Sequence, residues 1–331
     1  MVSMEPPSIK RRLIEALSGS RGVFLSGQSL ADMLGCSRTA VWKHIDDLRK
    51  EGFQIEAVRK KGYKIIKTPD QISENEILFG LGTERIGRNI VFYETVDSTQ
   101  RLAHEMAHNG ATEGTIVIAD EQTGGRGRMS RQWHSPRQQG IWMSMILRPN
   151  LPPQKAPQFT LIAAVAAVQA IEEVAGLNPE IKWPNDILIQ GKKMTGILTE
   201  LQADPDHIHF LIIGMGMNVN QHQEDFPPEV KDAATSLSIE KGEPISRVLL
   251  IRSYLEHFEK YYDIYMEKGF GPLKLLWESY AVSIGKNIIA RTLSGEIAGR
   301  AIGITEDGVL RIQDKYGQIH EVYSADIEIK P

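Results

Sequence analysis

The sequence contains one cysteine, Cys36, among its 331 residues, so an internal disulfide and a four-thiolate zinc site are both excluded. Long apolar runs are also lacking: the longest lies within residues 161–168, far short of the roughly 18 residues that a membrane span requires. The opening residues, MVSMEPPSIKRR, have no apolar stretch typical of a signal peptide. We therefore expect a cytoplasmic protein that does not contact a membrane.

The chain also lacks the GxxxxGK[ST] pattern, which excludes a P-loop ATPase. With 24% charged and 41% hydrophobic residues, its composition is typical of a soluble globular protein and excludes a disordered chain or a coiled coil. At about 150 residues per domain, the length indicates two or three domains.

Charge is distributed unevenly along the chain. Residues 1–67 hold 13 lysines and arginines but only 7 aspartates and glutamates, a net charge of +6, whereas the remainder carries −10. The balance changes sign at Asp70. A basic head on an acidic body indicates that the head alone meets a polyanion, although chance clustering on a solvated face would give the same numbers.

The basic head has the pattern of a winged helix-turn-helix domain. Apolar residues at helical spacing predict helices over 9–17, 28–34 and 38–50, with Gly35 in the turn before the last helix. Strands over 53–58 and 63–66 flank a tip of three cations. A recognition helix in the major groove and a wing along the phosphates would contact DNA through Ser37, Arg38, Thr39, Lys43, His44, Arg59, Lys60 and Lys61. The alternative is a three-helix interaction module with a solvated basic loop.

The body is expected to be α/β (α+β). Strands over 90–94, 115–120 and 141–147 and helices over 99–109 and 157–175 come first. Four consecutive strands over 181–183, 186–190, 195–202 and 207–213 predict an antiparallel or mixed sheet, and helices over 246–268 and 272–280 follow. Residues 283–331 alternate apolar side chains at period two between glycine-containing turns, which predicts a small SH3-like barrel. The predicted domains are therefore 1–67, 70–282 and 283–331.

Three motifs in the body resemble sites but have simpler explanations. His104-Glu105-Met-Ala-His108 matches the zinc pattern HExxH, yet both histidines fall opposite the apolar face of the helix. His207 and His209 alternate on a predicted strand, as a half-exposed pair would. Residues 125–130 nearly match GxGxxG, but no helix follows to bind a phosphate. We therefore expect no metal site and no dinucleotide site.

Four segments combine isolated polar groups with glycines that permit unusual backbone geometry. They are residues 97–100 (DSTQ), 122–133 (QTGGRGRMSRQW), 182–186 (KWPND) and 214–220 (GMGMNVN). A helix cap, a turn or a bulge would explain most of them singly. The Gly-Arg loop is harder to explain in this way, because three arginines on an irregular segment can fold around an anion.

In combination and in this order, the four segments resemble the biotin–protein ligase family, and the whole chain resembles its bifunctional members, which also repress biotin genes. The resemblance implies a central domain like that of class II synthetases. It implies formation of biotinyl-5′-adenylate from biotin and ATP with Mg²⁺, and transfer of biotin to a lysine of a biotin carboxyl carrier protein. It also implies operator DNA as a partner, the adenylate as corepressor, and a homodimer in the adenylate-bound state, paired edge to edge through strands around residues 193–200.

The resemblance also assigns roles to single residues. The expected biotin-binding residues are Ser98, Thr99, Gln100, Gln122, Arg126, Gly127, Arg128 and Lys182. The expected nucleotide-binding residues are Arg128, Arg131, Trp133, Lys182 and Asn218. Lys182, Arg128 and Arg126 would act in catalysis, because a carboxylate that attacks a triphosphate needs cations to offset the repulsion. No enzyme nucleophile is needed, since the acceptor lysine attacks the adenylate itself.

Two positions depart from the usual family sequence: Ser130 replaces the third glycine of the loop, and Gln100 stands where asparagine is common. Two other functions are compatible with parts of the pattern. One is a ligand-sensing repressor without ligase activity, against which the three cations argue. The other is a lipoate–protein ligase, whose long apolar pocket fits the polar Ser98 and Gln122 less well.

Overall fold

The computed structural model describes residues 9–20, 23–50, 52–67 and 72–330. Residues 1–8 and Asp70, on which the expectations about a signal peptide and a charge boundary fall, lie outside the described residues. The chain divides into two compact units. One comprises Met1–Gly82 with Ser246–Arg252, and the other Thr83–Ile245 with Ser253–Pro331. The first unit thus extends beyond the basic head of residues 1–67.

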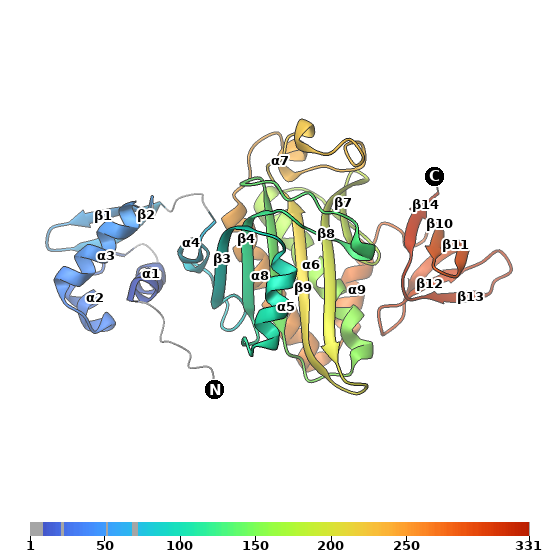
Figure 1. Cartoon of the computed structure of the whole chain (residues 1–331), viewed down its shortest axis with the longest axis horizontal. Helices are drawn as coiled ribbons and strands as arrows, with labels where there is room; N and C mark the ends of the chain where they lie inside the picture. The colour runs from blue at the N-terminus through green and yellow to red at the C-terminus, as the bar shows by residue number, and fades with distance from the viewer. Residues whose placement is uncertain (1–8, 21–22, 51, 68–71, 331) are drawn as a thin grey trace. The chain divides into compact units, whose positions relative to one another are not determined.

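The head forms the predicted helix-turn-helix with a wing. It contains α1 (Ile9–Gly19), α2 (Gly27–Leu34), α3 (Arg38–Lys50), β1 (Gln54–Val58) and β2 (Gly62–Lys67) (Figure 1). The Ser26 hydroxyl caps α2 by accepting a hydrogen bond from the Ser29 N–H at 3.0 Å, and Gly35 ends that helix with a left-handed φ of 65°. The buried core of the head consists of Leu13, Ile14, Leu17, Leu30, Ala31, Leu34, Val41, Ile45, Leu48, Phe53 and Ile55.

A short helix that the sequence did not predict, α4 (Glu74–Leu78), belongs to the same unit. Ser73 caps it by accepting from the Glu76 N–H at 3.2 Å. The Arg252 guanidinium donates to the carbonyls of Ile77, at 3.1 Å, and of Glu76. These bonds give hydrogen-bond partners to backbone groups that a short helix leaves unpaired. α4 is therefore stabilised by side chains and not by helix propensity alone.

The central sheet has seven strands in the order β3-β4-β5-β9-β8-β7-β6. Their bounds are β3 (Asn89–Val96), β4 (Thr115–Gln122), β5 (Gly140–Leu147), β6 (Glu180–Lys182), β7 (Asp186–Ile189), β8 (Lys192–Ala203) and β9 (Ile208–Asn218). Only β3 and β4 pair in parallel, and the other neighbours are antiparallel. The expected mixed sheet is confirmed, and the GMGMN segment is the end of β9 and not a separate bulge.

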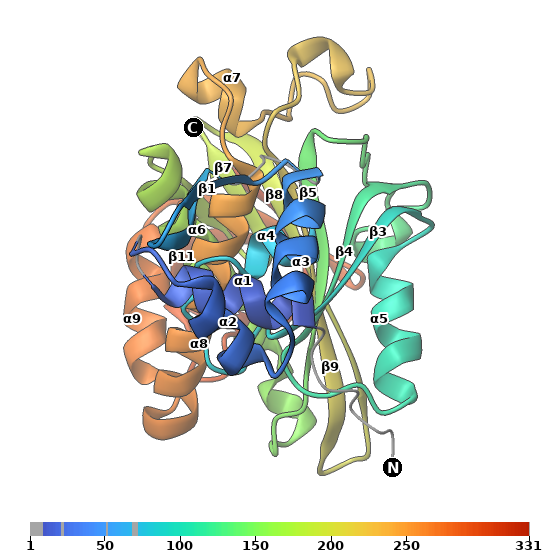
Figure 2. The same ribbon diagram turned by 90° about the vertical axis from the view of Figure 1, so that its left-hand side faces the viewer.

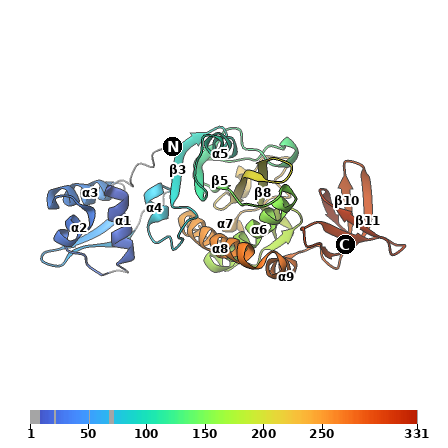
Figure 3. The same cartoon turned by 90° about the horizontal axis from the view of Figure 1, so that it is seen from below.

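Helices cover both faces of this sheet. α5 (Thr99–His108) lies on one face, and α6 (Ala156–Ala175), α8 (Arg247–Lys268) and α9 (Gly271–Tyr280) lie on the other (Figures 2 and 3). The remaining helix described in this region, α7 (Leu237–Lys241), was not predicted. The segment Pro153–Ala175, which contains α6, is long and apolar enough to cross a membrane. However, 72% of its most apolar 18-residue stretch is buried in the protein. α6 is therefore a core helix.

The pairing of β8 corrects the expectation of a free edge around residues 193–200. Residues Lys192–Gly196 of β8 pair with β7 on one side, and Thr195–Ala203 pair with β9 on the other. The part without a second strand among the described residues begins only at Leu198, since Ile197 donates from its N–H to the Asn185 carbonyl at 2.9 Å. The exposed edge is therefore the distal half of β8, up to Ala203.

The C-terminal part is an antiparallel sheet in the order β13-β12-β11-β10-β14. Its strands are β10 (Asn287–Thr292), β11 (Gly295–Ile304), β12 (Leu310–Gln313), β13 (Ile319–Val322) and β14 (Asp326–Ile329). It lies in the same compact unit as the central sheet. The Trp183 indole N–H donates to the Gly308 carbonyl at 3.1 Å, so this domain is attached directly to the KWPND segment.

Candidate active site

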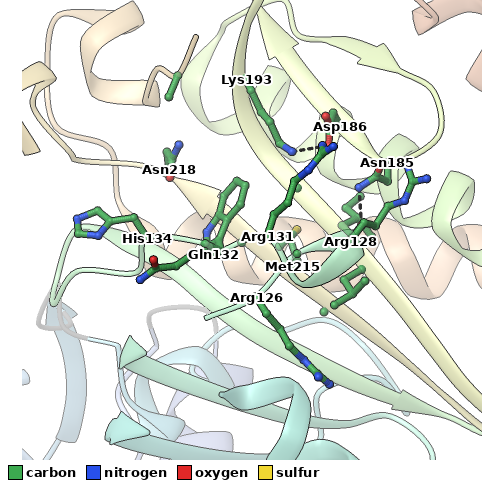
Figure 4. A pocket seen from close by; sticks show the side chains of 18 of the residues that line it. Arg126, Arg128, Arg131, Gln132, His134, Asn185, Asp186, Lys193, Met215 and Asn218 are labelled. Atoms are coloured by element: carbon green, nitrogen blue, oxygen red, sulfur yellow. Dashed lines mark hydrogen bonds and ion pairs between the residues drawn. The ribbon is translucent and has the colours of Figure 1, made fainter. Parts of the chain in front are cut away.

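One cavity of about 490 Å³ collects the expected site residues. Its lining comes from the start of α5, the Gly-Arg loop, the turn between β6 and β7, strands β5, β8 and β9, and the start of β14 (Figure 4). Every residue assigned above to biotin or nucleotide lines it: Ser98, Thr99, Gln100, Gln122, Arg126, Gly127, Arg128, Arg131, Trp133, Lys182 and Asn218. Segments more than a hundred residues apart in sequence thus share one cavity.

A chain of buried hydrogen bonds forms one end of the cavity. The Thr99 N–H donates to Gln122 Oε1 at 2.9 Å, and the Thr99 hydroxyl lies 2.9 Å from Ser144 Oγ. Ser144 in turn donates to Gln100 Oε1 at 3.0 Å, and Gln122 Nε2 donates to Ser135 Oγ at 3.0 Å. Thr99, Gln100 and Ser144 are buried. Because buried polar groups need partners, this chain fixes the orientation of each amide and hydroxyl.

The Gly-Arg loop folds back on itself as an irregular hairpin. The Gly127 N–H donates to the Arg131 carbonyl at 2.8 Å, and the Trp133 N–H donates to the Gly125 carbonyl at 2.9 Å. At the tip, Met129 and Ser130 have left-handed φ values of 54° and 57°. Ser130, which replaces the family glycine, therefore keeps a glycine-like conformation at a cost of about 1–2 kcal/mol.

Four cations lie around the middle of the cavity. Arg128 donates to Asn185 Oδ1 at 3.0 Å and to Ser324 Oγ at 2.6 Å, and its burial lowers the pKa of its guanidinium. Lys193 pairs with Asp186 at 2.7 Å. Arg131 pairs with Asp326, and Lys182 makes no ion pair within the described residues. Arg128 likewise has no ion pair in the described part of the chain, so Lys182 and Arg128 are the cations left for a ligand.

Arg126 takes a different direction from the other loop arginines. Its side chain points away from Arg128 and Arg131 (Figure 4). Its guanidinium lies 3.2 Å from the Glu200 carboxylate, on the exposed edge of β8. Arg126 lines the cavity, but its charge is directed to the sheet edge in this structure.

The Trp133 side chain packs against two glycines of the central sheet, Gly196 and Gly216. A Cβ at Gly216 would come within 2.3 Å of Trp133 Nε1, and one at Gly196 within 2.9 Å of the indole ring. Lys193, on β8, places its Nζ 5.3 Å from the centroid of the Trp133 ring. Gly214 and Gly216 have no left-handed φ, so the expected role of glycine as a source of unusual backbone geometry is wrong here. These glycines are needed because side chains approach the backbone closely.

Asn218 is buried at the end of β9. Its Nδ2 donates to the Thr235 carbonyl at 3.1 Å, and its Oδ1 accepts from Gln221 Nε2 at 3.0 Å. The side chain holds the segment before α7 against the cavity.

Sequence reasoning missed several lining residues. Ser144 is the one polar side chain in the buried strand β5, and that isolation was a usable signal. Lys193 and Asp326 gave no such signal, because single charged residues on strands are usually solvated, and Asp186 was assigned no role although it lies in the KWPND segment.

The histidines of the HExxH match and the His207/His209 pair make packing and hydrogen-bonding contacts that are common in proteins. His104 packs edge-on against Phe210, with ring centroids 5.2 Å apart, and His108 is exposed. His209 pairs with Asp204 at 3.1 Å, and its ring centroid lies 5.7 Å from that of His207. Within the described parts of the chain, no three histidine, cysteine, aspartate or glutamate side chains gather to hold a metal.

The head presents most of its expected DNA-binding residues to solvent. Arg38, Thr39 and Lys43 are exposed on α3, whereas His44 is half-buried. The Ser37 hydroxyl accepts a hydrogen bond from the Ala40 N–H at 3.1 Å and so caps α3. The wing tip of Arg59, Lys60 and Lys61 is exposed between β1 and β2. The sequence did not single out Trp42, which is 56% exposed on α3.

Comparisons with known proteins give one consistent result. Residues 92–218 match the biotin/lipoate A/B protein ligase family, residues 10–64 a helix-turn-helix domain, and residues 283–330 the biotin protein ligase C-terminal domain. The chain is 57% identical to the bifunctional ligase/repressor BirA of Bacillus subtilis, covering 97% of this chain and 99% of the relative. It is 26% identical to the BirA of Escherichia coli, covering 94% of both chains.

Among solved structures, the chain is similar to the biotin protein ligase from Aquifex aeolicus in complex with biotin and ATP. The TM-score is 0.64 at 31% identity, over 73% of this chain and 99% of that one. Together with the helix-turn-helix head and the cavity, these matches show that the chain belongs to the biotin–protein ligase family, among its bifunctional ligase/repressor members.

Proposed function

We propose that this protein forms biotinyl-5′-AMP from biotin and ATP and transfers the biotin to a lysine of a biotin carboxyl carrier protein in the cytoplasm. The observation that carries the proposal is that one cavity is lined both by uncharged polar side chains and by cations. The buried Thr99 and Gln100 and the half-buried Gln122 offer a hydroxyl and two amides that suit the polar ureido ring of biotin. The cations around Lys182 and Arg128 suit a carboxylate beside a triphosphate.

In the first step, a biotin carboxylate oxygen attacks the α-phosphorus of ATP and pyrophosphate leaves. Lys182 supplies a compact positive charge for the entering oxygen and the phosphate, since it has no ion-pair partner in the described residues. Arg128 supplies a planar fork held in place by Asn185 and Ser324. Both charges lower the barrier by stabilising negative charge as it grows.

In the second step, the acceptor lysine amine attacks the carbonyl carbon of the mixed anhydride and AMP leaves with the bonding electrons. The chain itself supplies no nucleophile, which agrees with Cys36, the one cysteine, lying in the head. The edge of β8 from Leu198 to Ala203 is our candidate docking site for the carrier protein.

ATP would bring Mg²⁺, which supplies charge that offsets the triphosphate. Magnesium is commonly held by one or two carboxylates together with phosphate oxygens and water. Asp186 and Asp326 line the cavity and can supply such oxygens, so the donor set fits a metal that arrives with its nucleotide.

We also propose that the head binds operator DNA of biotin genes, with the adenylate as corepressor. One winged helix reads about half of a two-fold operator, so a homodimer is needed to place two recognition helices. We assign the dimer contact to the same β8 edge, which would make dimerisation and carrier docking mutually exclusive.

The test of the ligase mixes the full chain with ATP, labelled biotin and a purified carrier domain. Labelled carrier and released pyrophosphate are the expected products. Lipoate in place of biotin should give little transfer. Lipoylation without biotinylation would assign the chain to the lipoate ligases, and absence of both would leave a ligand-sensing repressor.

A further inference from the structure

The recognition helix of the head carries a large aromatic side chain on its outer side. Trp42 is 56% exposed in the middle of α3, and it is the bulkiest of the exposed apolar residues in the described part of the head. The inward stripe of this helix is Val41, Ile45 and Leu48, which are fully buried. The core of the head is therefore complete without Trp42.

The surroundings of Trp42 indicate an anionic partner. At 100° per residue, Arg38, Thr39 and Trp42 fall within one arc of about 100°, and Lys43 follows on the same outer side. All four are exposed. The carboxylates of the next turn, Asp46 and Asp47, lie 2.6 and 4.0 Å from Lys50. Arg38 and Lys43 form no ion pair among the described residues, so the first two turns of α3 keep their positive charge.

A double-stranded DNA major groove matches both features of this face. Its phosphates are negative, and its edges carry the C5 methyl groups of thymine, which make apolar contacts with protein side chains. Recognition helices contact base edges through their N-terminal residues, where Arg38, Thr39 and Trp42 lie. A partner protein would need a strongly acidic surface to match the six net positive charges of residues 1–67, whereas every DNA duplex supplies phosphates.

We propose that Trp42 is a specificity-determining residue, which contacts a thymine C5 methyl in the major groove of the operator. Arg38 and Lys43 flank it and contact phosphates. This inference rests on the proposed repressor function and deepens it, since it names the base that the helix reads.

The test does not assume an operator sequence; it first selects the duplex that the protein binds. The full chain, with biotin and ATP, selects duplexes from a random pool, and the enriched duplex becomes the probe. Each thymine of that duplex is then replaced in turn by deoxyuridine, which removes only the methyl group. For the wild-type chain, one or two of these replacements in each half-site should weaken binding about tenfold.

Trp42→Ala should bind the original duplex about as weakly as the wild type binds the methyl-free one, and removing the methyl should then have no further effect. Trp42→Phe should retain part of the methyl dependence. Two controls are matched to these variants. Lys61→Ala, on the wing, should weaken binding to all duplexes and reduce the salt dependence while keeping the methyl dependence. Leu275→Ala removes a side chain that is 70% exposed on α9 and should change nothing.

The outcomes distinguish failure of the proposed repressor function from failure of the proposed role of Trp42. If no duplex is enriched over the pool, the repressor function itself fails. If a duplex is enriched but Trp42→Ala keeps the wild-type affinity or the wild-type methyl dependence, the role of Trp42 is overturned while DNA binding stands. A far-ultraviolet circular dichroism melt of each variant should match the wild type, because Trp42 contributes nothing to the buried core.

Discussion

The Arg131 guanidinium forms an ion pair with the Asp326 carboxylate, and this contact joins the tip of the Gly-Arg loop to the first residue of β14. The hydrogen bond from Arg131 lowers the pKa of Asp326, and the same contact raises the pKa of Arg131. The pair therefore contributes fully above the ordinary aspartate pKa of 3.8 and is lost only as the pH falls through the lower folded value. At neutral pH it restrains the loop.

Asp326→Asn should release the loop without unfolding the protein. Both side chains of the pair are largely exposed, so the loss of global stability should stay within about 1 kcal/mol. Tryptic cleavage after Arg128 or Arg131 in the ligand-free protein should become several-fold faster, as measured by mass spectrometry of timed digests. Asp314→Asn, which changes the 2.9 Å contact between Asp314 and His320 in the C-terminal domain, is the matched control and should leave loop cleavage unchanged. Equal cleavage in both variants would show that the pair does not restrain the loop.

Lys182→Ala and Arg128→Ala should both slow adenylate formation, at a cost of about 2–4 kcal/mol in the transition state. The two variants should differ in thermal stability. Lys182 has no ion pair among the described residues, so its loss should leave the thermal midpoint nearly unchanged. Arg128→Ala also removes the bonds to Asn185 and Ser324 and should lower the midpoint.

Pyrophosphate release measures the rate, and a thermal melt measures the stability. Lys182→Arg keeps the charge and should recover part of the activity. Wild-type rates in both alanine variants would contradict the role of these cations.

The order of the helices and strands could be predicted from the sequence because the periodicity of apolar residues is local. The bounds predicted for α3 and for the end of α6 agree with the structure. The short helices α4 and α7 have only five residues each and depend on capping by Ser73 and Ser236, so no periodic pattern marked them. The edge predicted around residues 193–200 is right only for residues 198–200, because β7 covers residues 192–196 and the sequence of β8 does not show which strands lie beside it.

The candidate site was only partly visible in the sequence. The Gly-Arg loop and KWPND stood out through residues that break regular structure. The resemblance, and not the spacing, assigned their roles. Lys193 and Asp326 enter the cavity because distant strands bring them there, and nothing in their local sequence marks a site. Ser144 is marked only by being an isolated polar residue in an apolar strand. The close approach of Trp133 to Gly216 likewise depends on the pairing of distant segments.

Gly216→Ala should displace Trp133, because the new Cβ would lie 2.3 Å from the indole nitrogen. We expect weaker retention of the adenylate by at least tenfold and a change in tryptophan fluorescence, while binding of biotin alone is nearly unaffected. Isothermal titration with biotin and with a non-hydrolysable biotinyl-adenylate analogue separates the two effects. Gly271→Ala, with no atom within 4 Å of the added carbon, is the control. Equal adenylate affinity in the two variants would exclude Trp133 from the nucleotide end.

Ser144→Ala should weaken biotin binding through a residue that need not touch biotin. The substitution leaves Gln100 Oε1 without its Ser144 donor and the Thr99 hydroxyl with one partner in place of two, since its bond to Gln122 Oε1 at 3.1 Å remains. A buried polar group without a partner costs about 1–3 kcal/mol, so both the thermal midpoint and the biotin affinity should fall. The KM for ATP at saturating biotin should not change. Ser279→Ala, at an exposed serine on α9, is the control, and an unchanged biotin affinity in Ser144→Ala would remove Ser144 from the binding end.

Deletion of residues 1–67 should abolish operator binding and leave a ligase, because every residue assigned to biotin or nucleotide lies beyond Asp97. The deletion also has a structural consequence. Phe79 packs against the hydrophobic core of the head, and α4 belongs to the same compact unit. A chain that begins at residue 68 therefore exposes this aromatic side chain and should aggregate at lower temperature than the full chain. Deletion of residues 1–82, or Phe79→Ser in the shorter deletion, should restore solubility with the same rate of pyrophosphate release. Static light scattering during a thermal ramp and the adenylation assay test the two parts separately, and loss of adenylation in all three truncated proteins would show that the head is needed for catalysis.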